Sequence, residues 1–183
     1  MSELSPVQNK IYSLESDLID FTKKNTLSFL TLKRVFSKNL TTLDLIYFKA
    51  DELLKSYPAK EHKDILCLLM IYYMLLILVI RDNKKFNSEI NEDQLEELNE
   101  LVNHKAHELI EHVISKNRKY GNSALNPIRI MSTADKLEQL YIRLDDKFNR
   151  LINRQNDDDE DLPFDVAGYF ILIYVHFKLE MNK

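Results

Sequence analysis

Histidine and glutamate side chains gather in one short segment, at His104, His107, Glu108, Glu111 and His112. Glu108 and Glu111 are three positions apart, so a helix would place both carboxylates on one face. Two carboxylates on one helix face can bind a divalent cation through their oxygen atoms. The same residue types are also common on solvated helix surfaces. The spacing therefore leaves a metal site and an ordinary surface as alternatives.

A second candidate is Asp165, which lies in an expected helix, residues 161–181, that is apolar on nearly every side. A helix that is apolar on nearly every side is buried in a protein. A buried carboxylate needs a cation, a metal ion or several hydrogen-bond donors. The alternative is that Asp165 occupies the first helical turn, where the helix dipole favours negative charge. Both interpretations stay open on the sequence alone.

The scarcity of turn-forming residues indicates the fold class. Only two glycines and four prolines occur in 183 residues, while 45% of the residues are hydrophobic. The turns of sheet proteins draw on glycine and proline. We therefore predict an all-α protein, a bundle of six or seven helices with a central apolar C-terminal helix. The single cysteine, Cys67, excludes an internal disulfide and lies in an apolar run that favours a buried thiol.

Capping residues and helix breakers locate the ends of the expected helices. Pro58 ends one helix, and Gln94 completes a capping box with a residue three positions earlier. The predicted N-caps are Thr42, Asn91 and Asp161. The expected helices span residues 6–23, 25–37, 42–57, 60–84, 91–119, 132–154 and 161–181. We expect residues 1–94 to form an N-terminal helical region and residues 95–183 a second helical domain, or both to form one continuous bundle.

Residues 65–80 form an unbroken apolar run, ILCLLMIYYMLLILVI. A membrane-spanning helix usually needs about 20 apolar residues, so a buried core helix is favoured over a membrane span or an apolar partner interface. The first ten residues lack the apolar core of a signal peptide. We therefore expect a cytoplasmic protein without a membrane segment.

The charge distribution bears on nucleic-acid partners. The formal net charge is −4, and residues 157–161 are all acidic. Proteins that bind duplex nucleic acid present clustered lysine and arginine side chains to the phosphates. No expected helix carries such a basic face, so duplex nucleic acid is not an expected partner.

Three short patterns occur in order along the second half of the chain. They read K-N-x-x-Y-G-x-S at 116–123, R-x-x-D-K-x-x-R at 143–150 and E-D-x-x-x-D-x-A-G-Y at 160–169. This ordered set resembles the phage nucleotide-modification-associated domain family of the first type, over residues 105–180. That family is distantly similar to MazG-like nucleoside triphosphate pyrophosphohydrolases. The resemblance implies an all-α fold and a role in supplying or processing modified nucleotides for phage DNA.

The resemblance also implies a nucleotide site assisted by Mg²⁺, in which the ion neutralises phosphate charge. The implied metal ligands are Glu108, Glu111, Asp146 and Asp165. The implied phosphate ligands are Lys116, Arg143, Lys147 and Arg150. The implied contacts to base or sugar are Tyr120 and Asn122. No residue is assigned a catalytic role.

The acidic residues depart from the pyrophosphohydrolase pattern. The dense E-E-x-x-E run of those enzymes is reduced here to Glu108 and Glu111, and Asp161 and Asp165 do not match their E-x-x-D spacing. We predict a phage- or prophage-type nucleotide-handling protein in a bacterial or phage-infected cell, with Mg²⁺-dependent pyrophosphohydrolysis as its enzymatic form. The alternatives are a nucleotide-binding module without catalysis, including one that captures a signalling nucleotide, and a helical protein-interaction module.

Helical wheels place five of these candidates away from the apolar stripes of their own helices. Glu108 and Glu111 lie opposite the stripe of the expected helix 91–119. The same holds in the expected helix 132–154 for Arg143, Asp146 and Arg150. A functional site there requires another helix or subunit that covers this side. Because two-fold assemblies are the commonest oligomers, we expect a homodimer.

Overall fold

Six α-helices and two short 3₁₀ helices account for the regular structure in the computed structural model, which describes residues 4–36, 40–87, 90–91, 93–153 and 161–180. No strand occurs in these ranges, so the predicted all-α class is confirmed. The elements are α1 (Pro6–Phe36), α2 (Thr42–Ser56), η1 (Tyr57–Ala59), α3 (Lys63–Asp82), η2 (Lys84–Phe86), α4 (Asp93–Lys119), α5 (Lys136–Ile152) and α6 (Leu162–Glu180).

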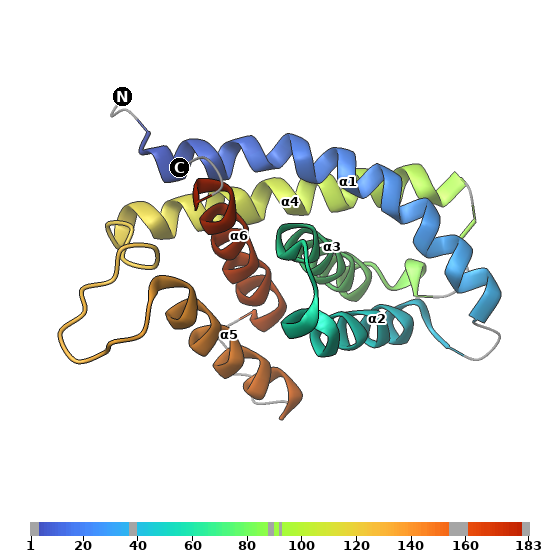
Figure 1. The fold of residues 1–183 in the computed structure, drawn as a ribbon. Coiled ribbons are helices and arrows are strands. Elements are labelled where there is room, and N and C mark those ends of the chain that lie inside the picture. The colour runs from blue at the N-terminus through green and yellow to red at the C-terminus, as the bar shows by residue number, and fades with distance from the viewer. Residues whose placement is uncertain (1–3, 37–39, 88–89, 92, 154–160, 181–183) are drawn as a thin grey trace.

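The helices surround a pair formed by α3 and α6. These two helices pack against each other, and the long helices α1 and α4 run side by side across one face of the pair (Figure 1). On the remaining sides α2 covers α3, and α5 covers α6. One continuous hydrophobic core therefore includes side chains from all six helices.

The predicted caps and stops explain where several helices begin and end. Asn91 and Gln94 exchange backbone-to-side-chain hydrogen bonds of 2.9 and 3.2 Å, which confirms the capping box ahead of α4. Asp161 accepts a hydrogen bond from the Phe164 backbone and caps α6 as predicted. The cap of α2 is Thr41 rather than Thr42, because the Thr41 hydroxyl accepts from the Asp44 backbone.

Helix α1 is continuous, so the predicted break near residues 24–25 is wrong. Two threonines on either side of the predicted break bond to the backbone of this one helix: Thr22 and Thr26 each donate to the carbonyl four residues earlier, at 2.8 and 2.9 Å. The Thr26 hydroxyl also accepts a hydrogen bond of 3.0 Å from Tyr72 of α3. These threonines are fully buried, and they tie α1 to the core.

Helix α5 begins later than predicted, at Lys136, with Asp135 as its N-cap. The predicted start at Ser132 is wrong because the Ser132 hydroxyl accepts from the Ala134 backbone in a local turn and leaves the cap position to Asp135. Residues 126–135 consequently form a loop without helix between the end of α4 and α5.

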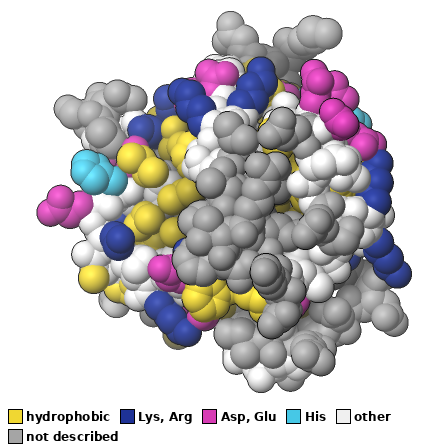
Figure 2. Space-filling model, turned by 90° about the vertical axis from the view of Figure 1, so that its right-hand side faces the viewer, with side chains coloured by type: hydrophobic (Ala, Val, Ile, Leu, Met, Phe, Trp, Pro, Cys, Tyr) yellow, Lys and Arg dark blue, Asp and Glu magenta, His cyan; other side chains and the backbone are white. Residues whose placement is uncertain are grey.

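Helices α3 and α6 are long and apolar enough to cross a membrane, but 72% and 61% of their most apolar stretches are buried inside the bundle. Every residue from Met70 to Ile80 is buried. Outside the residues drawn in grey, the end of the molecule on the right of Figure 1 shows groups of hydrophobic side chains beside charged ones (Figure 2). This burial is the pattern of core helices in a soluble protein.

Leu75→Ala is expected to lower the free energy of unfolding by about 2–5 kcal/mol, because it opens a cavity at a fully buried position of α3. Ile65→Ala, on the same helix but 48% exposed, is the matched control and should change stability by about 0.5 kcal/mol or less. Chemical denaturation of both variants measures the difference, and equal losses would contradict the assignment of α3 to the core.

Candidate functional site

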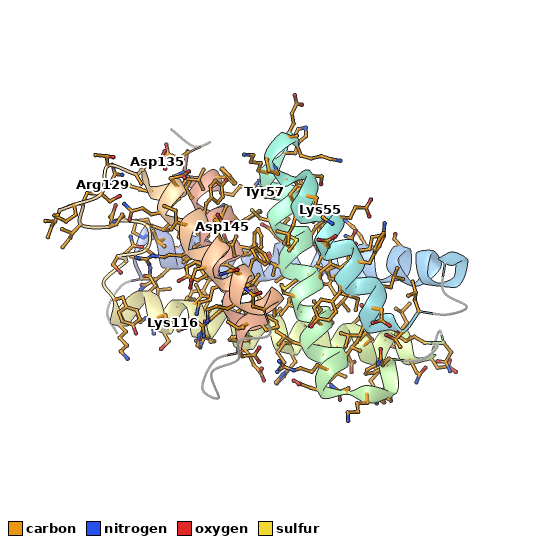
Figure 3. All side chains as sticks on the ribbon, turned by 90° about the horizontal axis from the view of Figure 1, so that it is seen from below. Lys55, Tyr57, Lys116, Arg129, Asp135 and Asp145 are labelled. Carbon is orange, nitrogen blue, oxygen red and sulfur yellow. The ribbon has the colours of Figure 1, made fainter. Side chains whose placement is uncertain are left out.

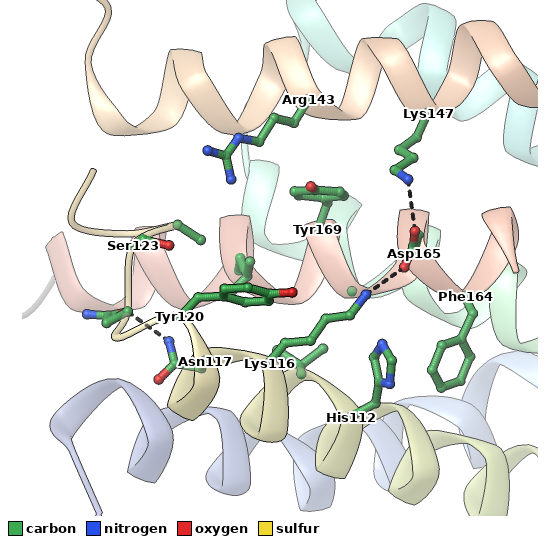
Figure 4. Close-up of a pocket in the computed structure, with 15 residues that line it drawn as sticks. His112, Lys116, Asn117, Tyr120, Ser123, Arg143, Lys147, Phe164, Asp165 and Tyr169 are labelled. Atoms are coloured by element: carbon green, nitrogen blue, oxygen red, sulfur yellow. Dashed lines mark hydrogen bonds and ion pairs between the residues drawn. The ribbon is translucent and has the colours of Figure 1, made fainter. Parts of the chain in front are cut away.

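A cavity of about 440 Å³ lies where α4, α5 and α6 meet (Figure 4). Helix α6 contributes Asp165, Gly168 and Tyr169, and α5 contributes Arg143 and Lys147. The end of α4 and the turn that follows it supply the other side of the cavity. The polar and aromatic lining residues on that side are His112, Lys116, Asn117, Tyr120, Asn122 and Ser123.

The turn after α4 is held in place by hydrogen bonds of Asn117. This buried side chain donates to the Asn122 side chain at 2.9 Å and accepts from Gln8 of α1 at 3.2 Å. Gly121 and Asn122 both adopt left-handed backbone angles, with φ of 59° and 60°. These are the residue types that tolerate that conformation best. The chain therefore reverses direction directly after Tyr120 and brings Ser123 to the cavity.

Close packing of α6 against α4 fixes the depth of the cavity. Gly168 faces α4, and a Cβ atom at this position would lie 3.4 Å from the Val113 side chain. Asp165, Tyr169 and Leu172 share one face of α6 with Gly168, since they are spaced three and four residues apart. The cavity is therefore the polar end of an otherwise apolar interface between helices.

Asp165 forms ion pairs with two lysines that come from different helices. Its carboxylate lies 3.1 Å from Nζ of Lys116 on α4 and 3.0 Å from Nζ of Lys147 on α5. Burial opposes ionisation of Asp165, but the hydrogen bonds and positive charges of Lys147 and Lys116 outweigh it and hold its pKa below the ordinary value. The carboxylate that the sequence led us to expect as buried is 17% exposed, and lysines compensate its charge.

Positive charge exceeds negative charge in the cavity. Among the described residues that line the cavity, Lys116, Lys147 and Arg143 face the carboxylate of Asp165 alone. No carboxylate of the described residues lies within ion-pair distance of Arg143. In this part of the chain, an anion that enters the cavity therefore meets a guanidinium without a carboxylate partner and two lysines that are paired with Asp165.

His112 adds a titratable group to the same cavity. Its ring packs edge-to-face on Phe164 with the ring centroids 5.0 Å apart. Burial, and then the charge of Lys116, lower the pKa of His112, although Asp165 acts in the opposite direction. Its Nε2 atom is buried and has no hydrogen-bond partner within the described part of the chain. The lowered pKa and the buried Nε2 atom both favour the neutral form of the imidazole.

Five of the six residues that the sequence implied for nucleotide contacts line this cavity: Lys116, Tyr120, Asn122, Arg143 and Lys147. Arg150 does not line it. Sequence reasoning assigned no role to Asn117, Phe164 or Tyr169. Spacing could have located Tyr169, because it lies four residues after Asp165 and shares its face of α6.

The four implied metal ligands do not come together. Only Asp165 lines the cavity. Glu108 is exposed and pairs with Lys105 at 2.8 Å and His104 at 3.2 Å, whereas Glu111 lies beside the hydroxyl of Tyr12 on α1. The exposed fourth ligand, Asp146, is also absent from the cavity lining. The described residues contain no group of three or more His, Cys, Asp or Glu side chains placed to hold a metal ion.

The cavity is complete within one chain. The sequence suggested that Arg143 faces solvent unless another helix or subunit covers it. Arg143 is exposed, but it lines the cavity that α4, α6 and the turn after α4 form with α5, and it lies across the cavity from this turn (Figure 4). A second subunit is therefore not required to form this site.

Comparison with known proteins finds no family model, no curated protein and no solved structure that matches this chain. Any functional conclusion therefore depends on the side chains of the cavity themselves. The resemblance of the three sequence patterns to a nucleotide-modification-associated family remains a prediction.

Asp165→Asn should lower the free energy of unfolding at pH 7 by about 1–3 kcal/mol, because it removes the charge that compensates Lys147, whose side chain is 13% exposed. Asp146→Asn, an exposed aspartate on α5, is the control and should have little effect.

The effect of Asp165→Asn should depend on pH. Since the folded-state pKa of Asp165 is depressed, its stabilising contribution is fully present above the ordinary value near 3.8 and is lost as pH falls through the folded-state pKa. Urea unfolding from pH 7 to pH 3 measures this. A stability difference between wild type and variant that stays constant down to pH 3 would contradict the ion-pair assignment.

Proposed function

We propose that the cavity between α4, α5 and α6 binds a nucleotide, a small molecule that carries both phosphate groups and a planar ring. The observation that carries this proposal is the excess of positive charge, from Lys116, Lys147 and Arg143, beside two tyrosines and a cluster of amides. A ligand with phosphate groups alone would leave the tyrosines and amides without contacts, and a ligand with a planar ring alone would leave the cations without contacts. The cytoplasm, where we expect the protein to act, contains such ligands in abundance.

The cations suit the phosphate groups. An arginine can bind two phosphate oxygens at once through its planar guanidinium, whereas a lysine contributes a point charge. Arg143 is exposed and has no carboxylate partner among the described residues, so it can engage a phosphate without first breaking an ion pair. Lys116 is 49% exposed and can also reach an incoming anion.

The aromatic and amide side chains suit the base and sugar. Tyr120, which is 57% exposed, and the half-buried Tyr169 offer ring surfaces on which a base can stack. Asn122 and Ser123 provide hydrogen-bond donors and acceptors for the edge of the base or the hydroxyls of a sugar.

Binding without catalysis is the form of this proposal that the geometry supports best. Among the described residues, the cavity is lined by one carboxylate, that of Asp165, and two lysines already pair with it. Mg²⁺-dependent hydrolysis needs several oxygen ligands that converge on the ion. The pyrophosphohydrolase activity implied by the sequence resemblance is therefore the second candidate, and it is separated from binding by product analysis.

Nucleoside triphosphates are expected to raise the melting temperature of the protein, because a ligand that binds only the folded state stabilises it. The test uses a panel of ribo- and deoxyribonucleotides, with and without Mg²⁺, followed by chromatography of the products. No shift with any nucleotide would refute the proposal. Cleavage between the α- and β-phosphates would show that the protein is an enzyme rather than a binder.

Arg143→Gln should weaken nucleotide affinity about tenfold or more, since a hydrogen bond to a charged group contributes about 1.5–3 kcal/mol. Arg150→Gln is the matched control, because Arg150 lies on the same helix two turns away and does not line the cavity. Titration calorimetry measures both variants. Equal losses of nucleotide affinity in the two variants would show that Arg143 does not bind the phosphate groups in this cavity.

Nucleotide binding should raise the pKa of His112, because a phosphate close to Lys116 stabilises the protonated imidazole. In the free protein this pKa is lowered by burial and by Lys116. An NMR titration of the histidine ring signals detects the change, with exposed His104 as the internal control. A bound nucleotide that leaves the His112 titration unchanged would argue against binding in this cavity.

A further inference from the structure

The loop between α4 and α5 exposes three large apolar side chains within four residues. Ile128, Ile130 and Met131 are 87%, 84% and 95% exposed, which makes them the most exposed large hydrophobic residues in the described part of the chain. The loop extends away from the helices at one edge of the molecule (Figure 1). Clustered apolar side chains on a surface commonly mark a protein interaction site.

A groove with apolar walls lies on a different part of the surface. It encloses about 740 Å³ between α2 and η1 on one side and α5 on the other. Figure 3 shows Lys55 and Tyr57 on the first side and Asp145 on the helix opposite. The apolar walls include Leu54, Tyr57, Tyr141, Leu144, Phe148 and Phe170.

The groove carries an excess of negative charge. Its lining includes the carboxylates of Asp51, Glu138 and Asp145 and the amines of Lys55 and Lys63. Asp51 pairs with Lys55, and Lys63 lies over the rings of Tyr57 and Tyr141, 5.4 and 6.0 Å from their centroids.

Two carboxylates of the groove are available to a partner. Glu138 and Asp145 are seven residues apart, so they share one face of α5. Neither forms an ion pair with a cation of the described residues.

The exposed loop has the complementary charge. Arg129 stands between Ile128 and Ile130 and is the only charged residue in positions 120–134. In the chain that carries it, Arg129 lies at the far end of the loop and points away from Asp145 (Figure 3). The loop and the groove thus match in both apolar character and charge, but they do not meet within one chain.

We propose that the loop of one copy occupies the α2–α5 groove of a second copy. Ile128, Ile130 and Met131 then replace solvent along the apolar walls, and Arg129 pairs with Glu138 and Asp145. A two-fold axis lets each copy insert its loop into the other, which fills both grooves and closes the assembly as a dimer. This dimer uses surfaces outside the nucleotide cavity, so it does not depend on the proposed function.

Sedimentation equilibrium over a range of concentrations tests the apolar half of the contact. Wild type is expected to form dimers, and Met131→Glu should raise the dimer dissociation constant at least tenfold. Ile142→Glu is the matched control, because Ile142 is 55% exposed on α5 and lies outside the groove; it should leave the constant unchanged. A wild-type protein that stays monomeric, or equal effects of the two variants, would overturn the proposal.

Mixing two charge variants tests whether the contact joins different copies. Arg129→Glu and Asp145→Arg should each dimerise at least tenfold more weakly alone, because each homodimer contains two repulsive contacts. A mixture of the two variants should restore tight dimerisation. In the mixed dimer, the loop of the Arg129→Glu copy meets the groove of the Asp145→Arg copy, so that contact has its charges reversed. The other contact pairs Arg129 with Asp145, as in the wild type. Circular dichroism first checks that both variants are folded. A mixture whose dimer dissociation constant is no lower than that of either variant alone would overturn the assignment of this groove.

Discussion

The packing of α3 against α6 is the interaction on which the rest of the structure depends. Both helices are apolar on nearly every side, so each must be covered along its whole circumference. The mutual contact satisfies one side of each, and α1, α2, α4 and α5 cover the others. The bundle therefore follows from two helices that cannot face water. It also requires α4 and α5 to meet at α6, which is where the cavity lies.

Charge enters this apolar arrangement at the first turn of α6. Asp165 would be costly to bury alone, and lysines from α4 and α5 compensate it from both sides. These two ion pairs join α4, α5 and α6 to one another at the cavity. Arg81 performs a comparable role at the end of α3: its guanidinium bonds both carboxylate oxygens of Asp161, the cap of α6, at 2.8 and 3.2 Å.

The sequence predicted correctly those parts of the fold that depend on residues close to one another along the chain. The capping box at Asn91 needs only two side chains three residues apart, and a sequence displays such a pair directly. The continuity of α1 depended instead on Tyr72, 46 residues away, which gives the Thr26 hydroxyl a buried partner. Five of the six implied nucleotide contacts reached one cavity, whereas Glu108 and Glu111 project from a face of α4 that the sequence could not place relative to α6.

The Asp165 triad also bears on which nucleotides the cavity would accept. A phosphate that binds Lys116 and Lys147 must compete with the carboxylate that already pairs with both. Its gain in binding free energy is therefore the difference between the new ion pairs and those that it replaces. A monophosphate carries about −1.5 to −2 at pH 7 and displaces a carboxylate of −1, so it adds at most about one negative charge at the lysines. A di- or triphosphate can contact Arg143 with one phosphate and the lysines with another, and it thereby also gains a guanidinium that has no carboxylate partner among the described residues. The proposed nucleotide site would therefore favour longer phosphate chains, because Asp165 raises the charge that a ligand must bring.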